Sequence, residues 1–281
     1  MIALAVALAA AAAPPAATPP PAPTASPVTT DRDQEIRAAI DSGRLVQAEL
    51  MLGQTPPASG PELALLADLR LAQKRFAEAI PMLQKLTVLQ PQDPHPVSRL
   101  GIALLDVGRT GEAEAMLVQA TALPGADWRA WNALGIAYDR RGAWPESRNA
   151  YARAMQLAPD QPAILNNAGY SLLLQRRPQE ARALIARARA LGGGDRRIAV
   201  NGELADAMTG TYPVARGAGE SAHDWAARLN NAGYAAFLAG DLASARSLFA
   251  RAIEASDTRY EVAEHNLARV EKAMGSGAKT P

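Results

Sequence analysis

Cysteine is absent from the 281-residue chain. Its absence excludes disulfide bonds, thiolate catalysis and zinc sites with cysteine ligands. It also leaves no cysteine for a lipobox, so we expect no lipid anchor. Aromatic residues are scarce as well, at 5%, whereas alanine is abundant. This composition is typical of closely packed helices and disfavours sheets.

A large excess of charge of either sign is also lacking. The chain has 29 basic and 28 acidic residues, which gives a formal net charge of +1. Such a balanced chain has no strong overall field to attract nucleic acid or an anionic membrane. We therefore expect no nucleic-acid partner.

Histidine is rare, occurring only at His95, His223 and His265. None of the three has the HExxH spacing of a metal site, and none adjoins a GxSxG serine motif. The dipeptide His223-Asp224 is better explained as the first turn of a helix than as a catalytic pair. We predict no catalytic residue, no metal site and no cofactor, and interpret the chain as non-enzymatic. A helical enzyme domain is the alternative from a different functional class.

The N-terminal part differs from the rest of the chain. Residues 2–13 read "IALAVALAAAAA", an apolar run of signal-peptide length that is too short to span a bilayer. We predict a signal peptide over 1–13 and an exported, periplasmic protein of the Gram-negative cell envelope. The alternative is a disordered alanine-rich tail. Residues 14–30 contain seven prolines, which predicts an extended Pro/Ala-rich linker.

A periodic helical pattern begins at Asp31. In its clearest stretch Trp131, Leu134 and Tyr138 are three, four or seven residues apart, so they share one face of a helix. The small residue Gly135 on that face allows a second, antiparallel helix to approach closely. The pattern predicts two helices packed against each other and joined by a turn at Gly142.

The same pattern recurs at intervals of 34 residues. The pair Leu134-Gly135 has counterparts at Leu66-Ala67, Leu100-Gly101 and Ala168-Gly169. Four consecutive units in this register resemble the tetratricopeptide repeat (TPR), a 34-residue helix-turn-helix unit. The resemblance implies an all-α fold, a TPR-type right-handed solenoid of helix-turn-helix units.

The predicted array covers residues 31–274 and contains about five to six units. The segment "NNAGY" at residues 166–170 returns 64 residues later, a distance of one full unit and one shortened unit. The shortened unit, 196–225, is degenerate because its second half contains Pro213 and two glycines, which are poor helix residues. We expect a capping helix over 260–274, a disordered tail over 275–281, and the weakest joint of the array at 213–220.

The resemblance to TPR proteins also implies a binding surface. In that family the first helix of each unit lines a concave face. The corresponding positions here, which we predict to be partner-binding, are Asn132, Ile136, Asn166, Tyr170, Leu173, Leu174, Asn230, Tyr234, Phe237 and Leu238. The expected ligand is a peptide segment of a protein partner, helical or extended, with asparagine amides bonded to its backbone. The alternative is that Tyr170 and Tyr234 pack against adjacent units as part of the core.

Within the family, the chain most resembles the TPR proteins encoded with tight-adherence (Flp) pilus assembly systems. The features that carry this resemblance are the export signal, the proline-rich lead, "WRAWNALGIAYDRRG" and the two "NNAGY" units. Members of that group are commonly lipoproteins, and the missing cysteine is a departure from them. The implied function is a scaffold or assembly factor for a pilus or secretion machine. The alternative is a periplasmic TPR adaptor for another envelope complex.

Overall fold

The computed structural model describes residues 31–53, 57, 59–192 and 194–276. These residues form fourteen helices and no strand, which confirms the predicted all-α fold. The predicted signal peptide (1–13), the linker (14–30) and residues 277–281 of the predicted tail lie outside the described residues.

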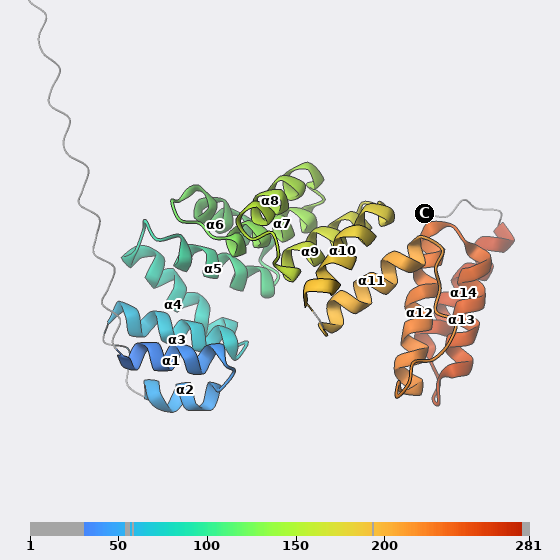
Figure 1. Cartoon of the computed structure of the whole chain (residues 1–281), viewed down its shortest axis with the longest axis horizontal. Coiled ribbons are helices and arrows are strands. Elements are labelled where there is room, and N and C mark those ends of the chain that lie inside the picture. The colour runs from blue at the N-terminus through green and yellow to red at the C-terminus, as the bar shows by residue number, and fades with distance from the viewer. Residues whose placement is uncertain (1–30, 54–56, 58, 193, 277–281) are drawn as a thin grey trace, which may run out of the picture.

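The helices follow one another with short connections (Figure 1). Their bounds are α1 Asp31–Asp41, α2 Leu45–Leu52, α3 Gly60–Ala72, α4 Phe76–Leu89, α5 Pro94–Asp106, α6 Thr110–Ala122, α7 Trp128–Arg141, α8 Trp144–Leu157, α9 Pro162–Leu174, α10 Pro178–Gly192, α11 Arg196–Met208, α12 Ala222–Ala239, α13 Leu242–Ala255 and α14 Glu261–Ser276. The last helix therefore continues past Met274, where we expected the capping helix to end.

Consecutive helices pair as antiparallel hairpins, and each hairpin packs against the next. The first helices of neighbouring hairpins also contact one another, as α5 does α7, α7 does α9 and α12 does α14. Helix α11 has no second helix, because residues 209–221 are non-helical, and it packs between α10 and α12 instead. In Figure 1 the helices after this interruption, α12 to α14, stand as a group at one end of the molecule.

Glycine allows the two helices of a hairpin to cross closely. A Cβ atom added at Gly135 would lie 2.7 Å from Cε1 of Tyr151, and one at Gly169 would lie 2.6 Å from Cγ1 of Ile185. The equivalent Gly101 and Gly233 face Leu117 and Phe249 in the same way. The sequence-based prediction of a close helix approach at Gly135 is therefore confirmed.

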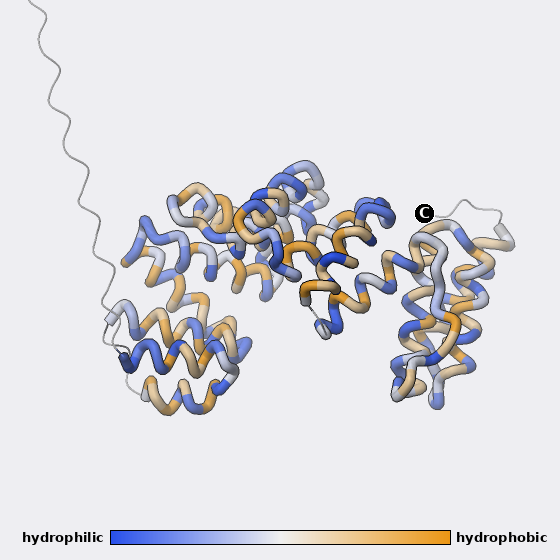
Figure 2. The backbone as a smooth tube through the Cα atoms, viewed as in Figure 1, coloured by the Kyte–Doolittle hydropathy of each residue, from blue (hydrophilic) through white to orange (hydrophobic). Residues whose placement is uncertain are grey.

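The core is a row of local clusters rather than one centre. One cluster runs from α3 to α8, a second from α9 to α11 and a third from the end of α11 to α14. Figure 2 accordingly shows hydrophobic residues distributed along every helix. Each unit thus depends mainly on its neighbours for burial, as is usual for solenoids.

The helix ends follow local rules. Gly142 ends α7 in the left-handed conformation at φ 71°, which confirms the turn predicted there. Ser221 caps α12 by accepting from the amide of Asp224, so His223-Asp224 lies in a first helical turn as expected. The Ser221 hydroxyl also bonds the Asp224 carboxylate and lowers the pKa of that group.

Candidate functional site

A ladder of asparagine side chains joins the first helices. The side-chain amide of Asn167 on α9 donates to Oδ1 of Asn132 on α7 at 3.1 Å. The next rung joins Asn201 to Asn166 at 2.9 Å, and a third joins Asn266 to Asn230 at 3.0 Å. The first two rungs join residues 35 positions apart in sequence, and the third joins residues 36 positions apart.

The ladder gives three of the predicted asparagines a contact within the array. Asn166 and Asn230 are buried, and the Oδ1 atoms of both, like that of Asn132, accept from the following helix. All three side chains lie between adjacent helices, where they link neighbouring units. The sequence-based prediction instead has them bond a partner's backbone. It did not include the bonds between the asparagines, and a role of the three asparagines in partner binding stays a prediction.

Two of the predicted apolar anchors are also part of the core. Leu173 on α9 and Phe237 on α12 each retain 4% of their exposure and belong to the clusters that hold adjacent helices together. Both side chains are thus buried in this structure, and their role in partner binding stays a prediction. The physical reason is that a helix packed on both flanks leaves only a narrow stripe exposed.

The remaining predicted residues lie at or near the surface. Tyr170 and Leu174 on α9 are 42% and 45% exposed, and Tyr234 on α12 is 39% exposed. The alternative that the two tyrosines are core residues does not hold, since both rings keep a large solvent-facing part. Ile136 and Leu238 are partly buried.

A contact across α11 brings these exposed residues toward one another. The guanidinium of Arg176, just after α9, donates from Nη1 to the carbonyl oxygen of Leu238 near the end of α12, at 3.2 Å. The two residues are 62 positions apart in sequence. This hydrogen bond links the segment after α9 to the C-terminal end of α12. The surface formed by α9, α11 and α12 is here called the first-helix face.

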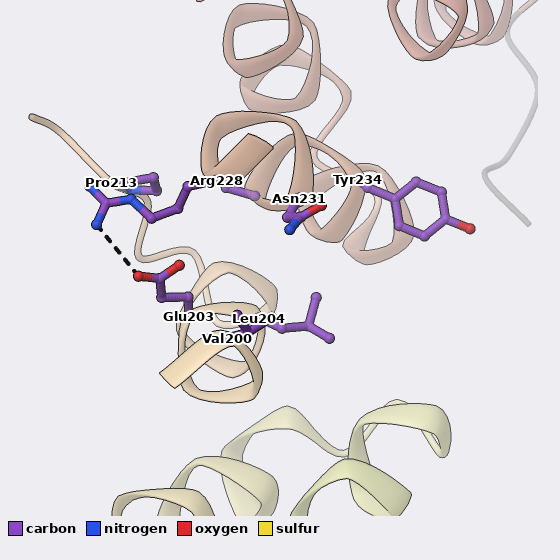
Figure 3. Close-up of a pocket in the computed structure, with 8 residues that line it drawn as sticks. Val200, Glu203, Leu204, Pro213, Arg228, Asn231 and Tyr234 are labelled. Carbon is purple, nitrogen blue, oxygen red and sulfur yellow. Dashed lines mark hydrogen bonds and ion pairs between the residues drawn. The ribbon is translucent and has the colours of Figure 1, made fainter. Parts of the chain in front are cut away.

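Two hollows lie on the first-helix face and share Val200 of α11. The first is a pocket of about 190 Å³ between α11, α12 and the segment 209–221. Its lining includes Val200, Leu204, Pro213, Asn231 and Tyr234. Figure 3 shows Leu204 and Tyr234 on one side of this pocket and the pair Arg228–Glu203 at the other. The second hollow, more open, extends from Val200 to Tyr170 and Asn167 on α9.

The polar end of the pocket is a network of charges centred on Arg228. Its guanidinium lies 3.5 Å from Glu203 of α11 and 3.4 Å from Glu220, and it covers the ring of Trp225. Burial raises the pKa of Glu203, while Arg228 opposes that rise. Arg228 also donates to the carbonyl of Ala215 at 2.9 Å, so the network ties the segment 209–221 to α12.

A second polar network lies at the α7–α8 crossing. The Asp139 carboxylate accepts from the hydroxyls of Ser147, Tyr151 and Ser171, the last of which belongs to the next unit. Burial and the adjacent carboxylate raise the pKa of Tyr151 well above its usual range. Ser147, where the TPR pattern prefers alanine, thus donates a hydrogen bond within its own hairpin, and Ser171 of α9 joins that hairpin to the next.

The described residues contain no group of three or more His, Asp or Glu side chains placed to hold a metal ion. Nor is any helix in the described ranges both long enough and apolar enough to cross a bilayer.

A protein-family model for the tetratricopeptide repeat matches residues 98–162 and 144–196. Over residues 98–196 the chain carries tetratricopeptide repeats. The two matches begin within α5 and end at the start of α11. TPR units are in general protein-interaction scaffolds. No sequence among the curated proteins matches the chain.

Solved TPR structures share the fold over most of the chain. A chain of the APC/C hetero-tetramer Cut9–Hcn1 superposes with a TM-score of 0.54 over 89% of this chain, at 16% identity. This chain spans 44% of that one. PilW, a widely conserved type IV pilus biogenesis factor, superposes with a TM-score of 0.55 at 15% identity, over 84% of this chain and 96% of PilW.

Sequence reasoning missed the residues that shape the pocket between α11 and α12. Val200 and Leu204 were not predicted because they lie in the degenerate unit, and Asn231 was not predicted because it follows the fifth position and is not one of the positions that the TPR resemblance places on the concave face. The available signal was the second asparagine of "NNAGY" together with the valine that replaces asparagine at the fifth position of α11.

Proposed function

We propose that this TPR protein is a non-enzymatic scaffold or assembly factor of the bacterial cell envelope, serving a pilus or secretion machine. It would act by holding a segment of a partner protein on the first-helix face. The observation that carries the proposal is the exposure of Tyr170, Leu174 and Tyr234 on that face, although the helices bearing them are otherwise packed. Aromatic side chains exposed on a rigid support bury a large area at little entropic cost when a partner binds.

The envelope part of the proposal has two supports. The apolar run over residues 2–13 has the length of a signal peptide and is followed by a proline-rich stretch. The fold is shared with PilW, whose described role is type IV pilus biogenesis, across nearly the whole of that protein. Both supports are consistent with the resemblance to Flp-associated TPR proteins.

The protein would act by binding a partner alone, without a chemical step. The first-helix face is pre-formed, since α9, α11 and α12 are held by packing, by the ladder and by the Arg176–Leu238 contact. A rigid surface loses little conformational entropy on association, so more of the contact energy is available as affinity. The conformational entropy lost on binding would come mainly from ordering the partner's segment, and little of it from ordering the array.

The test is capture of envelope partners by the full-length protein expressed in its native host. Tyr170→Ala and Tyr234→Ala should each reduce capture of the main partner about tenfold or more, equivalent to about 1.4 kcal/mol. Arg148→Ala and Arg246→Ala, at exposed positions on the second helices α8 and α13, are the matched controls and should change little.

Melting temperatures decide how the result is interpreted. If both tyrosine variants melt like the wild type and still capture the partner normally, the first-helix face is not the binding surface. Fractionation completes the test, since an intact Met1 in a cytosolic fraction would contradict export. A captured partner from a different envelope complex would replace the pilus assignment with the adaptor function.

A further inference from the structure

The joint between α11 and α12 is built differently from the joints on either side of it. In each earlier hairpin the second helix packs against the next unit, but after α11 the residues 209–221 are non-helical and α11 contacts α12 directly. Asparagine rungs join α9 to α11 and α12 to α14, whereas among the described residues none joins α11 to α12. The joint therefore lacks both the second helix and the rung that support its two neighbours.

The non-helical segment 209–221 is tied to the helices that follow it. The hydroxyl of Tyr212 donates to the carboxylate of Asp241, just before α13, at 2.9 Å. The guanidinium of Arg251 on α13 donates to the carbonyl oxygen of Pro213 at 3.3 Å. The segment therefore forms one body with α12 and α13, although it stands where a second helix for α11 would be.

The chain connection between α11 and that body is the short turn 209–211. Gly210 in this turn has the left-handed conformation, at φ 87°, which glycine adopts without strain. On its two sides lie residues 31–208, here called the N-terminal body, and residues 212–276, here called the C-terminal body. Non-covalent contacts must fix the angle between the two bodies, because the covalent link is one turn.

Two ion pairs cross the joint between α11 and α12. The nitrogen–oxygen distance is 3.5 Å between Arg228 and Glu203, a pair drawn in Figure 3, and 3.2 Å between Arg196 and Asp224. The Arg196 side chain is 85% exposed, and ion pairs at the surface are weak and screened by salt. Leu204 supplies apolar contact, since it packs against core clusters of both bodies. The electrostatic part of the joint should therefore weaken as the salt concentration rises.

Arg176 makes a third contact, at the C-terminal end of α12. It lies in the turn between α9 and α10 at φ 59°, a left-handed conformation that is unfavourable for a residue with a Cβ atom. The equivalent turns 34 and 68 positions earlier use Gly142 and Gly108. The Arg176 guanidinium donates to the carbonyl oxygen of Leu238 in the last turn of α12, where carbonyl groups lack partners within the helix and a cation is favoured. The strained turn thus places a positive charge against the C-terminal body.

From these contacts we infer that Arg176 is a latch that holds the C-terminal body against the N-terminal body, and that the array opens at the turn 209–211 when the latch is released. The pocket between α11 and α12 has walls on both bodies, so opening changes its shape. The inference goes beyond the proposed function, because it concerns the array without a partner.

The critical variant is Arg176→Gly, which removes the guanidinium. Glycine fits the left-handed turn without strain, so we expect this variant to stay folded. Lys74→Gly is the matched control, because Lys74 has the same φ of 59° in the turn between α3 and α4, inside the N-terminal body. Both variants relieve the same backbone strain, and only Arg176→Gly removes the contact with α12.

The distance between the bodies is measured on the full chain by single-molecule energy transfer between two dyes. The chain has no cysteine, so two introduced cysteines are labelled selectively. The pair Arg148→Cys on α8 and Arg246→Cys on α13 spans the joint, and both positions are exposed. The reference pair, Lys85→Cys on α4 with Arg148→Cys, lies within the N-terminal body.

The wild type at low salt should show one narrow α8–α13 distance distribution. Arg176→Gly should raise the ratio of open to closed molecules about two- to tenfold, as expected for loss of one hydrogen bond. Salt at about 1 M, where screening acts within about 3 Å, should change the wild type in the same direction. Lys74→Gly should match the wild type, and the reference pair should keep its distance throughout.

Four results would overturn the inference. The first is an α8–α13 distribution that is the same in Arg176→Gly and in the wild type, and the second is a wild type that does not respond to salt. An equal change in Lys74→Gly would assign the effect to the relieved turn. A shift of the reference pair would show that the whole array loosens. Partner capture by the tyrosine variants is measured separately, so the inference and the proposed function fail independently.

Discussion

The substitution Gly135→Ala tests the packing of the hairpin formed by α7 and α8. The added Cβ would lie 2.7 Å from Cε1 of Tyr151, whereas carbon atoms in contact are normally about 3.5–4.0 Å apart. The ring cannot retreat easily, because it is buried and its hydroxyl donates to Asp139 at 2.8 Å. Overpacking of this kind costs about 1–3 kcal/mol.

Helix propensity acts in the opposite direction. Replacing glycine by alanine inside a helix contributes about 1 kcal/mol of stability, so the net destabilisation at Gly135 should be about 0–2 kcal/mol. Gly111→Ala in α6 isolates the propensity contribution, because a Cβ at Gly111 would meet no atom within 4 Å. That variant should be stabilised by about 0.4–1 kcal/mol. The same chemical change is therefore expected to have opposite signs at the two positions.

Urea unfolding followed by tryptophan fluorescence is a suitable assay. Three of the four tryptophans, Trp128, Trp131 and Trp144, lie in this hairpin, so the signal reports on it locally even if the array does not unfold in one step. If Gly135→Ala raises the unfolding midpoint as Gly111→Ala does, the ring yields to the methyl group and the close-packing argument is refuted.

Three further predictions concern the array itself. Asn266→Ala should cost about 1–3 kcal/mol, because it leaves the buried Oδ1 of Asn230 without its donor; an unchanged melting temperature would show that the rung contributes nothing. Within the described residues, amides of 213–220 should exchange with deuterium fastest among the interior segments, since most have no helical hydrogen bond; strong protection there would contradict this. Asp241→Ala should cost about 1 kcal/mol at neutral pH by removing the cap of α13. Because the bonds from Ser244 lower the pKa of Asp241, the wild-type advantage should be present above about pH 4 and disappear as pH falls through the folded-state pKa; a difference that does not depend on pH would refute the assigned cause.

Residue spacing was sufficient to predict the helices and their pairing. The 34-residue recurrence and the apolar positions three and four apart are local features, so they predicted the hairpins from α3 to α10. The glycines at the helix crossings could also be predicted, because a small residue that recurs at one position of four consecutive units indicates a close approach of two helices there. Pro213 and the glycines after it likewise predicted where a second helix is missing. These features depend on neighbours within one or two turns, which the sequence displays directly.

The exposure of individual side chains was decided by tertiary packing. Leu173 and Leu174 are adjacent and chemically identical, yet the first is buried and the second is exposed. Successive side chains of a helix point about 100° apart, and the helices packed against α9 cover only the first of these two directions. The hydrogen-bond partner of each asparagine could not be predicted either, because each rung joins residues 35 or 36 positions apart on separate helices. The sequence by itself determined the repeat, the helices and the site of the lost second helix. Only the tertiary structure decided which stripe of each first helix faces solvent and which asparagines bond one another, because both follow from how separate units are rotated against one another.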